Sequence, residues 1–437
     1  MQKVFFATLG CKVNQYETEA MRQMLAKQGY ASTADESEAD LYVVNTCTVT
    51  ARSDQQARQL IRHLKRLNPQ AKLVAVGCGV ENPRSGLREL RDVDLALDNT
   101  RKMRIADYIV GFTAGCHPEV STGFKRPYQD VTLESFGERT RAFIKIEDGC
   151  SSFCSYCIIP YVRGFTRSRP LRSIVDEVRG LVEAGYKEVV LTGVQIGDYG
   201  DDLKDGTELA DVFEAILGEV EGDYRLRLSS IDPADVTEQL IDLVARSPKA
   251  CKHWHLPLQS GDDLILRKMN RDYTSSDYAR LVDRIRDKMP DAGINTDLIV
   301  GFPGETDESF DRTCEFVRRM GFSRMHIFRF SAREGTPAAR RKERVDPEAA
   351  RERSDRVAKL ARLMMLDFHR AFLGRMLDVL VEEDLDKRTN LPGGFSDNYI
   401  RVVIRSAGGM GPGNMAGRIA RVRADEAHDD HLVGMLT

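Results

Sequence analysis

The sequence predicts an α/β protein with three parts: an N-terminal open parallel sheet with helices, a central partial (β/α)6 barrel, and a small C-terminal β-barrel. Three observations support this prediction. Strand-like and helical segments alternate in about the first 110 residues, the alternation restarts near residue 139, and short strands between Gly-rich turns follow residue 371. Because 437 residues exceed one ordinary core, several domains are expected.

The N-terminal domain is predicted to span residues 1–112. Its expected strands cover residues 4–8, 41–45 and 73–76, and its expected helices cover residues 17–27 and 53–67. In parallel sheets of this kind, sites form beyond the carboxyl ends of the strands. Cys11, Cys47 and Cys78 each follow such an end, so we expect the three to converge on one sheet edge. From the residues alone, three interior cysteines without a common task fit equally well.

A second α/β unit is predicted after a linker over residues 113–138, which carries Gly, Pro, Ser and Thr without a sustained period. This core domain spans residues 139–370 and ends in a long charged helix. Six strands fall two short of a closed (β/α)8 barrel, so an open barrel is expected. The predicted strands cover residues 143–146, 189–192, 225–229, 253–258, 294–300 and 326–330, and the predicted helices include 173–184 and 349–373.

The last domain, residues 371–437, reads as a small β-structure. Strands are predicted in MLDVLVEE, NYIRVVIR and GRIARVRA, with Gly-rich turns in LPGGFSDN and GGMGPGNM. This pattern is compatible with a five-stranded barrel.

Composition restricts the class of protein. The hydrophobic fraction is 42% and the charged fraction 30%, and no apolar run approaches the ~20 residues that span a bilayer. The start MQKVFFATLG lacks a secretory signal, so we expect a cytoplasmic protein without membrane contact. Basic residues are in excess over residues 52–72 and 340–362, which fits either phosphate contacts or a solvated helix face.

The strongest motif is EDGCSSFCSYC, in which Cys150, Cys154 and Cys157 have C-x3-C-x2-C spacing after the first barrel strand. Three thiolates in eight residues can surround one metal centre. A 4Fe-4S cluster can leave one iron open, whereas zinc normally takes a fourth ligand. The cluster is favoured, with zinc or buried structural cysteines as alternatives.

This motif resembles that of the radical S-adenosylmethionine (SAM) enzymes, whose cluster binds SAM through its open iron. The stretches LTGVQIGDYG and TDLIVGFPGE extend the resemblance. From the residues alone, Ile299 is as well explained as plain core and Gly301 as part of a turn. The SAM contacts that the resemblance implies are Tyr156, Thr192, Gly193, Gln195, Ser229, Gln259, Ile299 and Gly301.

The whole chain resembles the methylthiotransferases of this superfamily. The resemblance implies that Cys11, Cys47 and Cys78 hold a second 4Fe-4S cluster and that the C-terminal domain is an RNA-binding TRAM domain. The opening TLGCKVNQYE resembles the bacterial members that act on N6-threonylcarbamoyladenosine of tRNA. The implied reaction adds a methylthio group to C2 of this nucleoside at position 37, with SAM as radical source and methyl donor. The implied partners are the tRNA anticodon loop and an electron donor such as a flavodoxin or ferredoxin.

Alternative functions are methylthio transfer to isopentenyl-adenosine of tRNA or to an aspartate of a ribosomal protein. A non-catalytic zinc-bound RNA-binding protein is an alternative of another class. Binding of RNA through the last domain requires its basic residues to share a face, and Tyr399 is a candidate for base stacking. His253 and His255 alternate on a strand and are expected to line the barrel. The candidate basic residues are Arg401, Arg405, Arg421 and Arg423, and Cys116, Cys251 and Cys314 are assigned to structure.

Overall fold

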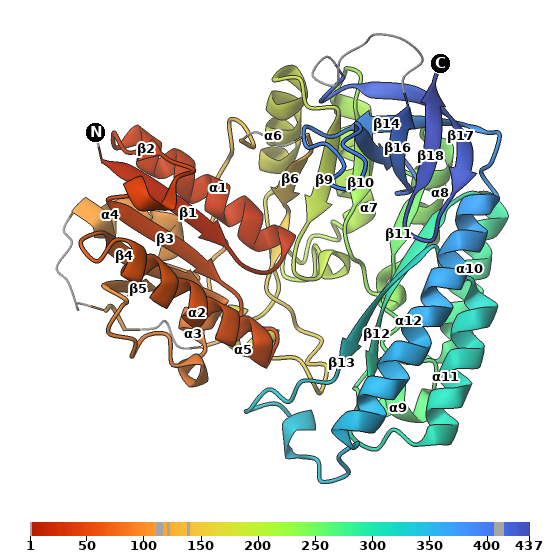
Figure 1. The fold of residues 1–437 in the computed structure, drawn as a ribbon, viewed down its shortest axis with the longest axis horizontal. Helices are drawn as coiled ribbons and strands as arrows, with labels where there is room; N and C mark the ends of the chain where they lie inside the picture. The colour runs from red at the N-terminus through yellow and green to blue at the C-terminus, as the bar shows by residue number, and fades with distance from the viewer. Residues whose placement is uncertain (1, 111–116, 120–122, 138–139, 406–414) are drawn as a thin grey trace.

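The computed structural model describes residues 2–110, 117–119, 123–137, 140–405 and 415–437, and its three parts follow the chain order (Figure 1). The N-terminal sheet lies at one side of the molecule, the larger barrel occupies the middle, and the small C-terminal barrel packs on one end of it. The predicted α/β class is confirmed. The residues at which one domain passes into the next remain a prediction.

The N-terminal domain is a five-stranded, fully parallel sheet in the order β2-β1-β3-β4-β5. All six residues of β3 are buried, because helices cover both faces of the sheet. The strands are β1 (Lys3–Thr8), β2 (Ala31–Ser32), β3 (Leu41–Thr46), β4 (Lys72–Gly77) and β5 (Leu95–Leu97). The helices are α1 (Lys12–Lys27), α2 (Ala51–Leu67), α3 (Cys78–Glu81) and α4 (Ile105–Val110).

The first helix begins five residues earlier than predicted, at Lys12 instead of residue 17. Cys11 has extended dihedral angles and caps it, so the helix starts directly after the cysteine. Val13, Tyr16 and Ala20 are buried at helical spacing and form the stripe that packs inward. The early start therefore fixes Cys11 and Lys12 at the end of a packed helix.

The central domain has six parallel strands in the order β6-β9-β10-β11-β12-β13, in which bridges such as Ser230 to His255 join two three-stranded sheets. The strands are β6 (Ala142–Lys145), β9 (Glu188–Thr192), β10 (Arg225–Leu228), β11 (His253–His255), β12 (Gly293–Val300) and β13 (Arg324–Arg329). The main helices are α6 (Leu171–Glu183), α7 (Leu209–Glu219), α8 (Glu238–Arg246), α10 (Ser275–Lys288), α11 (Asp307–Met320) and α12 (Pro347–Arg370). Shorter elements are β7 (Glu147–Asp148), α5 (Ile159–Arg163), β8 (Arg167–Ser168) and α9 (Asp263–Lys268).

The barrel is open, as predicted, because within the described chain β6 and β13 do not pair with each other. The N-terminal domain spans this gap. On one side Lys145 of β6 donates to Glu17 of α1 at 3.2 Å. On the other side Arg333, which follows β13, donates to Asp54 of α2 at 2.6 Å. One hydrophobic cluster runs without a break from the α1 face of the sheet into the barrel, so the two domains share a core.

The C-terminal domain is the predicted five-stranded closed barrel, in the order β14-β15-β16-β18-β17. The sequence analysis placed Gly393 and Gly394 in a turn, but both belong to β15. A Cβ on Gly394 would lie 2.0 Å from the carbonyl oxygen of Leu380, so the close approach of two strands requires glycine. The strands are β14 (Met376–Val381), β15 (Gly393–Ser396), β16 (Arg401–Arg405), β17 (Ile419–Ala427) and β18 (Leu432–Leu436).

A buried carboxylate, Glu188 of β9, organises the contact between the two barrels. It pairs with Arg225 and, at 2.8 Å, with Arg227, both of β10. Arg225 also donates to the carbonyl of Phe395 at 2.7 Å, and Arg227 to that of Asp397 at 2.8 Å. The guanidinium groups thus hold the C-terminal barrel by its backbone.

We expect Glu188→Gln to lower the free energy of unfolding by about 3–5 kcal/mol, because it leaves buried guanidinium charges without their carboxylate. Burial opposes ionisation of Glu188, but Arg227 and Arg225 outweigh it and lower its pKa to about 2. The stability that ionised Glu188 contributes is therefore fully present above its ordinary pKa of 4.5, and it is lost as the pH falls toward 2. Denaturant titrations of both proteins at several pH values measure this difference.

The matched control is Glu219→Gln. Glu219 pairs with Arg172 at 2.8 Å on the surface, where such pairs contribute less than about 1 kcal/mol. An equal decrease in the free energy of unfolding of the two variants would contradict the role given to Glu188.

Candidate active site between the N-terminal domain and the barrel

The three N-terminal cysteines meet at one edge of the sheet, as predicted. Cys11 caps α1, Cys47 follows β3, and Cys78 is the first residue of α3. A Cβ on Gly10 would lie 2.9 Å from the sulfur of Cys47, which shows how closely the loop before Cys11 approaches it. Burial raises the pKa of Cys47 to about 11, and the neighbouring Cys78 and Cys11 thiols add to this effect.

A sharp turn at Gly77 directs Cys78 toward this edge. Gly77 has a φ of +94°, and a Cβ there would lie 2.4 Å from the side-chain oxygen of Asn45. A larger residue is excluded by both the backbone conformation and the space. The strand therefore ends in a turn only glycine can make, and the cysteine comes directly after it.

The second set of cysteines lies beyond the carboxyl end of β6, in the loop after β7. Cys154 is buried and Cys150 and Cys157 are half-buried. Burial raises the pKa of Cys157 above its ordinary value, and the Cys154 and Cys150 thiols raise it further. Arg271 donates to the sulfur of Cys154 at 3.2 Å. Three crowded thiols with a cationic donor suit a bound metal centre, which takes them as thiolates.

Each cysteine set supplies three thiols from this chain. Among the described residues, the group of three candidate ligand atoms that lie within 4.8 Å of one another is formed by His255, Asp297 and His326 and contains no cysteine. A structural zinc site takes four protein ligands, whereas an iron–sulfur cluster can be held by three thiolates with one iron left open.

Arg163 joins the two cysteine sets. It lies at the end of α5, six residues after Cys157, and is fully buried. Its Nε donates to the sulfur of Cys78 at 3.1 Å, its Nη1 to Asp148 at 2.8 Å, and its Nη2 to Asn14 at 2.8 Å. Cys78 also packs against Ile158 and Val162 of the same segment. The loop that carries Cys150, Cys154 and Cys157 therefore leads directly to Cys78.

A buried charge network surrounds this junction. Glu17 of α1 pairs with Arg163 at 3.1 Å, with Lys145 at 3.2 Å and with Lys102. Burial opposes the ionisation of Glu17, but these three cations outweigh it and lower its pKa to about 2. The sequence alone does not predict this network, because its members come from four separate segments.

Four of the expected SAM contacts lie at the carboxyl ends of β9 and β10. Thr192 ends β9 and is buried, and a Cβ on the adjacent Gly193 would lie 2.6 Å from the carboxylate of Glu147. The backbone N–H of Gln195 donates to the carboxylate of Glu147 at 2.8 Å. Ser229 follows β10 and has a buried hydroxyl without a hydrogen-bond partner in the described chain. Such an orphaned hydroxyl is suited to a ligand.

The other four lie near the ends of β11 and β12. Ile299 is in β12 and belongs to a small hydrophobic cluster against which the Tyr156 ring packs. Gln259 and Gly301 both have positive φ, at 64° and 73°, so each marks a sharp change of chain direction. All eight residues therefore lie at the same end of the barrel as Cys150, in two groups.

An acidic cavity of about 200 Å³ lies beside the loop of Cys150 and contains Gln195. Burial raises the pKa of Asp198 to about 6 and that of Asp235 to about 7. Neither aspartate was among the residues predicted from the sequence. Asp198 lies within the stretch LTGVQIGDYG, which was the available signal.

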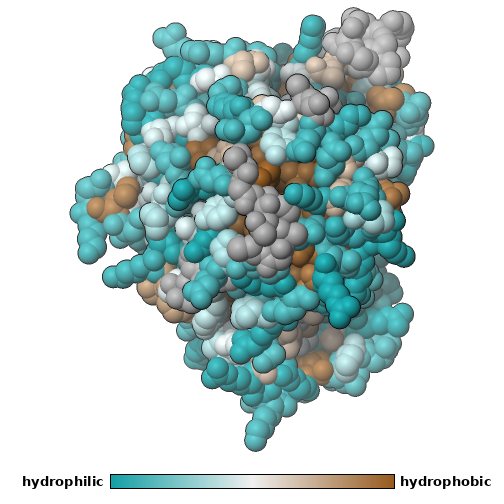
Figure 2. Space-filling model, turned by 90° about the vertical axis from the view of Figure 1, so that its left-hand side faces the viewer, coloured by the Kyte–Doolittle hydropathy of each residue, from teal (hydrophilic) through white to brown (hydrophobic). Residues whose placement is uncertain are grey.

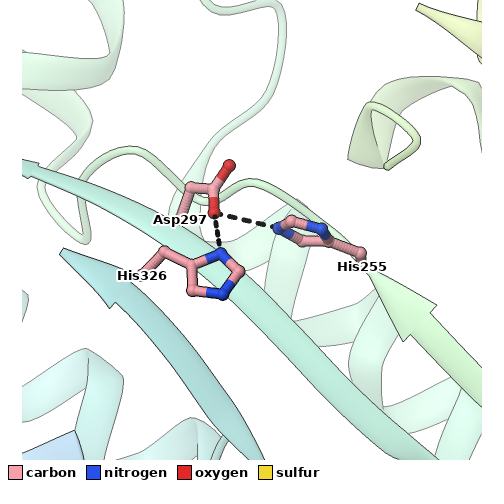
Figure 3. Close-up of side chains that lie close together, drawn as sticks. All are labelled: His255, Asp297 and His326. Atoms are coloured by element: carbon pink, nitrogen blue, oxygen red, sulfur yellow. Dashed lines mark hydrogen bonds and ion pairs between the residues drawn. The ribbon is translucent and has the colours of Figure 1, made fainter. Parts of the chain in front are cut away.

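Three side chains meet inside the barrel, from β11, β12 and β13 (Figure 3). Asp297 lies 2.9 Å from His255 Nε2 and 3.1 Å from His326 Nδ1. Burial opposes ionisation of Asp297, but the two hydrogen bonds lower its pKa well below the ordinary value. Of these three residues, only His255 was predicted to line the barrel. Its contact with Asp297 and that of Asp297 with His326 depend on strands far apart in the sequence.

The candidate RNA-binding residues of the C-terminal barrel are largely occupied. Arg401 pairs with Asp386 at 2.9 Å, and Arg405 pairs with Glu426. Tyr399 stacks on Phe395 and lies 4.6 Å from the His253 ring, so it packs between the barrels. Arg423 also forms an ion pair, with Asp425, whereas Arg421 is exposed.

A more open basic surface lies on α2 of the N-terminal domain. Arg62, Lys65 and Arg66 line a hollow of about 750 Å³. Figure 2 shows the side of the molecule that this domain forms, which is mostly hydrophilic with small scattered hydrophobic areas. The basic excess over residues 52–72 thus faces solvent in part. Of the remaining cysteines, Cys251 and Cys314 are buried, and Cys116 lies outside the described residues.

Comparison with known proteins finds matches to two families along the chain. Residues 3–98 match the uncharacterized protein family UPF0004, and residues 144–317 match the radical SAM superfamily. A threonylcarbamoyladenosine tRNA methylthiotransferase MtaB of Bacillus subtilis is 37% identical over 97% of this chain and 94% of its own. Its counterpart in Thermotoga maritima is 40% identical over 92% of this chain and 91% of its own.

A more distant relative is the tRNA-2-methylthio-N(6)-dimethylallyladenosine synthase of Desulforamulus reducens, 33% identical over 98% of this chain and 94% of its own. Among solved structures, the radical S-adenosylmethionine methyltransferase TsrM of Kitasatospora setae, with cobalamin and a [4Fe-4S] cluster bound, has a TM-score of 0.58. It is 18% identical and the match covers 78% of this chain and 77% of that one, so it supports the fold alone. No helix in the described residues has the length and apolar character needed to cross a membrane.

We expect Arg163→Met to loosen the N-terminal domain from the barrel, because Glu17 and Asp148 lose the cation that they share. Breaking a buried ion pair on one side costs about 3–5 kcal/mol. Hydrogen exchange of α1 and α5 should accelerate, while exchange of the C-terminal barrel should not change.

Arg172→Met provides the control, because Arg172 forms its ion pairs with Asp176 and Glu219 at the surface. Unchanged exchange at α1 in the Arg163 variant would show that the junction does not depend on this guanidinium.

Proposed function

The chain belongs to the radical SAM methylthiotransferases, and on that premise we propose that it adds a methylthio group to C2 of N6-threonylcarbamoyladenosine at position 37 of tRNA. One observation carries the proposal. The loop of Cys150, Cys154 and Cys157 continues into the segment that packs on Cys78, so both cysteine sets belong to one site. The names of the relatives that are 37% and 40% identical support this nucleoside as the substrate.

We assign each cysteine set to one 4Fe-4S cluster. Cys150, Cys154 and Cys157 would hold the cluster that binds SAM, and Cys11, Cys47 and Cys78 would hold the auxiliary cluster. Together the clusters and SAM supply the one-electron chemistry that breaks an unactivated carbon–hydrogen bond, and SAM also supplies the methyl group. The protein residues then hold the reactants in position and keep out water.

The SAM pocket is assigned to the carboxyl ends of the barrel strands. The orphaned hydroxyl of Ser229 and the acidic cavity with Asp198 and Asp235 suit a ligand that carries hydroxyl and cationic groups. Ile299 and Tyr156 offer an apolar surface for an adenine ring. The full set assigned to SAM is Tyr156, Thr192, Gly193, Gln195, Ser229, Gln259, Ile299 and Gly301.

The N-terminal domain has a second task, to close the open side of the barrel. Its contacts on both sides of the gap, through Lys145 and Arg333, shield the interior from solvent. The basic hollow on α2 is a surface for tRNA phosphates beside the anticodon loop. An electron donor of the flavodoxin or ferredoxin class and a cytoplasmic location complete the proposal.

Nucleoside analysis tests the substrate. In tRNA from a strain that lacks this protein, the 2-methylthio form of N6-threonylcarbamoyladenosine should disappear and its unmethylthiolated precursor should accumulate. The methylthio form of isopentenyl-adenosine serves as internal control and should stay. Persistence of the first product in the deletion strain would refute the proposed substrate.

Iron and acid-labile sulfide analysis tests the two ligand sets. Anaerobically purified wild type should hold about eight irons per chain, and a Cys150, Cys154, Cys157 triple Ala variant about four. A Cys251→Ala, Cys314→Ala variant controls for loss of cysteine as such, because both thiols are buried and belong to neither set. Iron near zero in the triple variant, or zinc in the wild type, would contradict the assignment.

A further inference from the structure

Lys12 is a cation without a protein counterion beside the auxiliary cysteines. It directly follows Cys11, its side chain is half-buried, and it forms no hydrogen bond or ion pair with any residue that the structure describes. Its surroundings are predominantly basic, because Arg227 and Arg141 lie near it and Glu188 is the nearby acid.

The neighbouring guanidinium groups are already occupied. Arg227 donates to Glu188 at 2.8 Å and to the carbonyl of Asp397 at 2.8 Å. Arg141 donates to Glu382 at 2.8 Å and stands 4.8 Å over the Phe395 ring. Glu188 is shared by Arg225, Arg227 and Arg141 and forms no ion pair with the ammonium of Lys12. The region therefore has a surplus of positive charge, and Lys12 has neither a hydrogen-bond partner nor an ion-pair partner among the described residues.

His253 is a second unsatisfied group in the same region. It is 5% exposed, and neither of its ring nitrogens has a hydrogen-bond partner in the described chain. Burial holds its pKa well below the ordinary value, and the nearby charges of Arg227, His255 and Lys12 add to this effect, so the ring is neutral and offers one N–H donor. A buried imidazole is normally hydrogen-bonded, and its orphaned state indicates a ligand with acceptor atoms.

We propose that Lys12 and His253 bind the carboxylate of the threonyl group of N6-threonylcarbamoyladenosine. The inference rests on the proposed function and adds the residues that select the substrate. The threonyl group is attached through its amine and keeps a free carboxylate, whereas the dimethylallyl group of the other tRNA substrate class is apolar. A surplus of positive charge attracts the carboxylate of the threonyl group. Burying these cations against the apolar dimethylallyl group would be unfavourable, because the apolar group offers them no hydrogen-bond acceptor.

The position of Lys12 in the chain determines where it would hold the substrate. Because it is adjacent to Cys11, a carboxylate held by its ammonium lies beside the auxiliary cysteine set. A charge-assisted hydrogen bond is short and directional, so it fixes one end of the modified base. Lys12 therefore selects the substrate and positions it, without a part in bond breaking.

The experiment compares Lys12→Met, Lys12→Arg and wild type on two substrates. One is tRNA with threonylcarbamoyladenosine, and the other is the same tRNA with the carboxylate converted to a neutral methylamide. On the first substrate Lys12→Met should raise KM about ten- to hundredfold, as expected for a lost hydrogen bond to a charged group. On the methylamide the two proteins should differ less than about threefold, and Lys12→Arg should recover most of the affinity. His253→Phe should raise KM for the carboxylate substrate in the same direction.

Lys27→Met is the matched control, since Lys27 lies on the same helix but forms an exposed ion pair with Glu134. Iron and sulfide contents of all variants should equal those of wild type. Equal KM values of Lys12→Met and wild type on the carboxylate substrate would overturn this inference alone, as would equal losses on both substrates. Absence of product from the wild-type enzyme would overturn the proposed function, and with it this inference.

Discussion

The open barrel is the constraint on which the rest of the molecule depends. In the described chain β6 and β13, the two outer strands of the six, do not pair with each other, so the interior needs a cover. The N-terminal domain provides it by contacting the β6 side through Glu17 and the segment after β13 through Asp54. The same placement brings Cys78 to the loop after Cys157. Closure of the fold and assembly of the site are therefore one event.

Charge, as well as apolar surface, specifies this closure. Arg163 and Lys145 of the central domain converge with Lys102 on Glu17, and the first two reach this carboxylate only when both domains are in place. Such buried pairs add little net stability compared with apolar packing, but a misplaced partner leaves a charge uncompensated. The network accordingly favours one docking geometry over its neighbours. That geometry also sets the distance between the two cysteine sets.

The sequence sufficed for the elements whose signals are local. Alternating patterns predicted the parallel sheet and the open barrel, and strand ends predicted where Cys11, Cys47 and Cys78 meet. It did not suffice for partners that meet only in the fold. Asp297 and His326 lie on strands separated by a helix, and Gly394 has the composition of a turn although it serves a close strand crossing. Both cases depend on contacts that no window of sequence contains.

Arg227 interacts both with the C-terminal barrel and with the surroundings of Lys12. It holds the backbone of the C-terminal barrel at Ser396 and Asp397, and it adds to the positive field around Lys12. A substitution of Arg227 therefore weakens the contact with the C-terminal barrel and also lowers the positive charge around Lys12. No single second substitution restores both. An engineer who wishes to alter the substrate range of this enzyme has more freedom at Lys12, whose side chain forms no hydrogen bond or ion pair with any described residue.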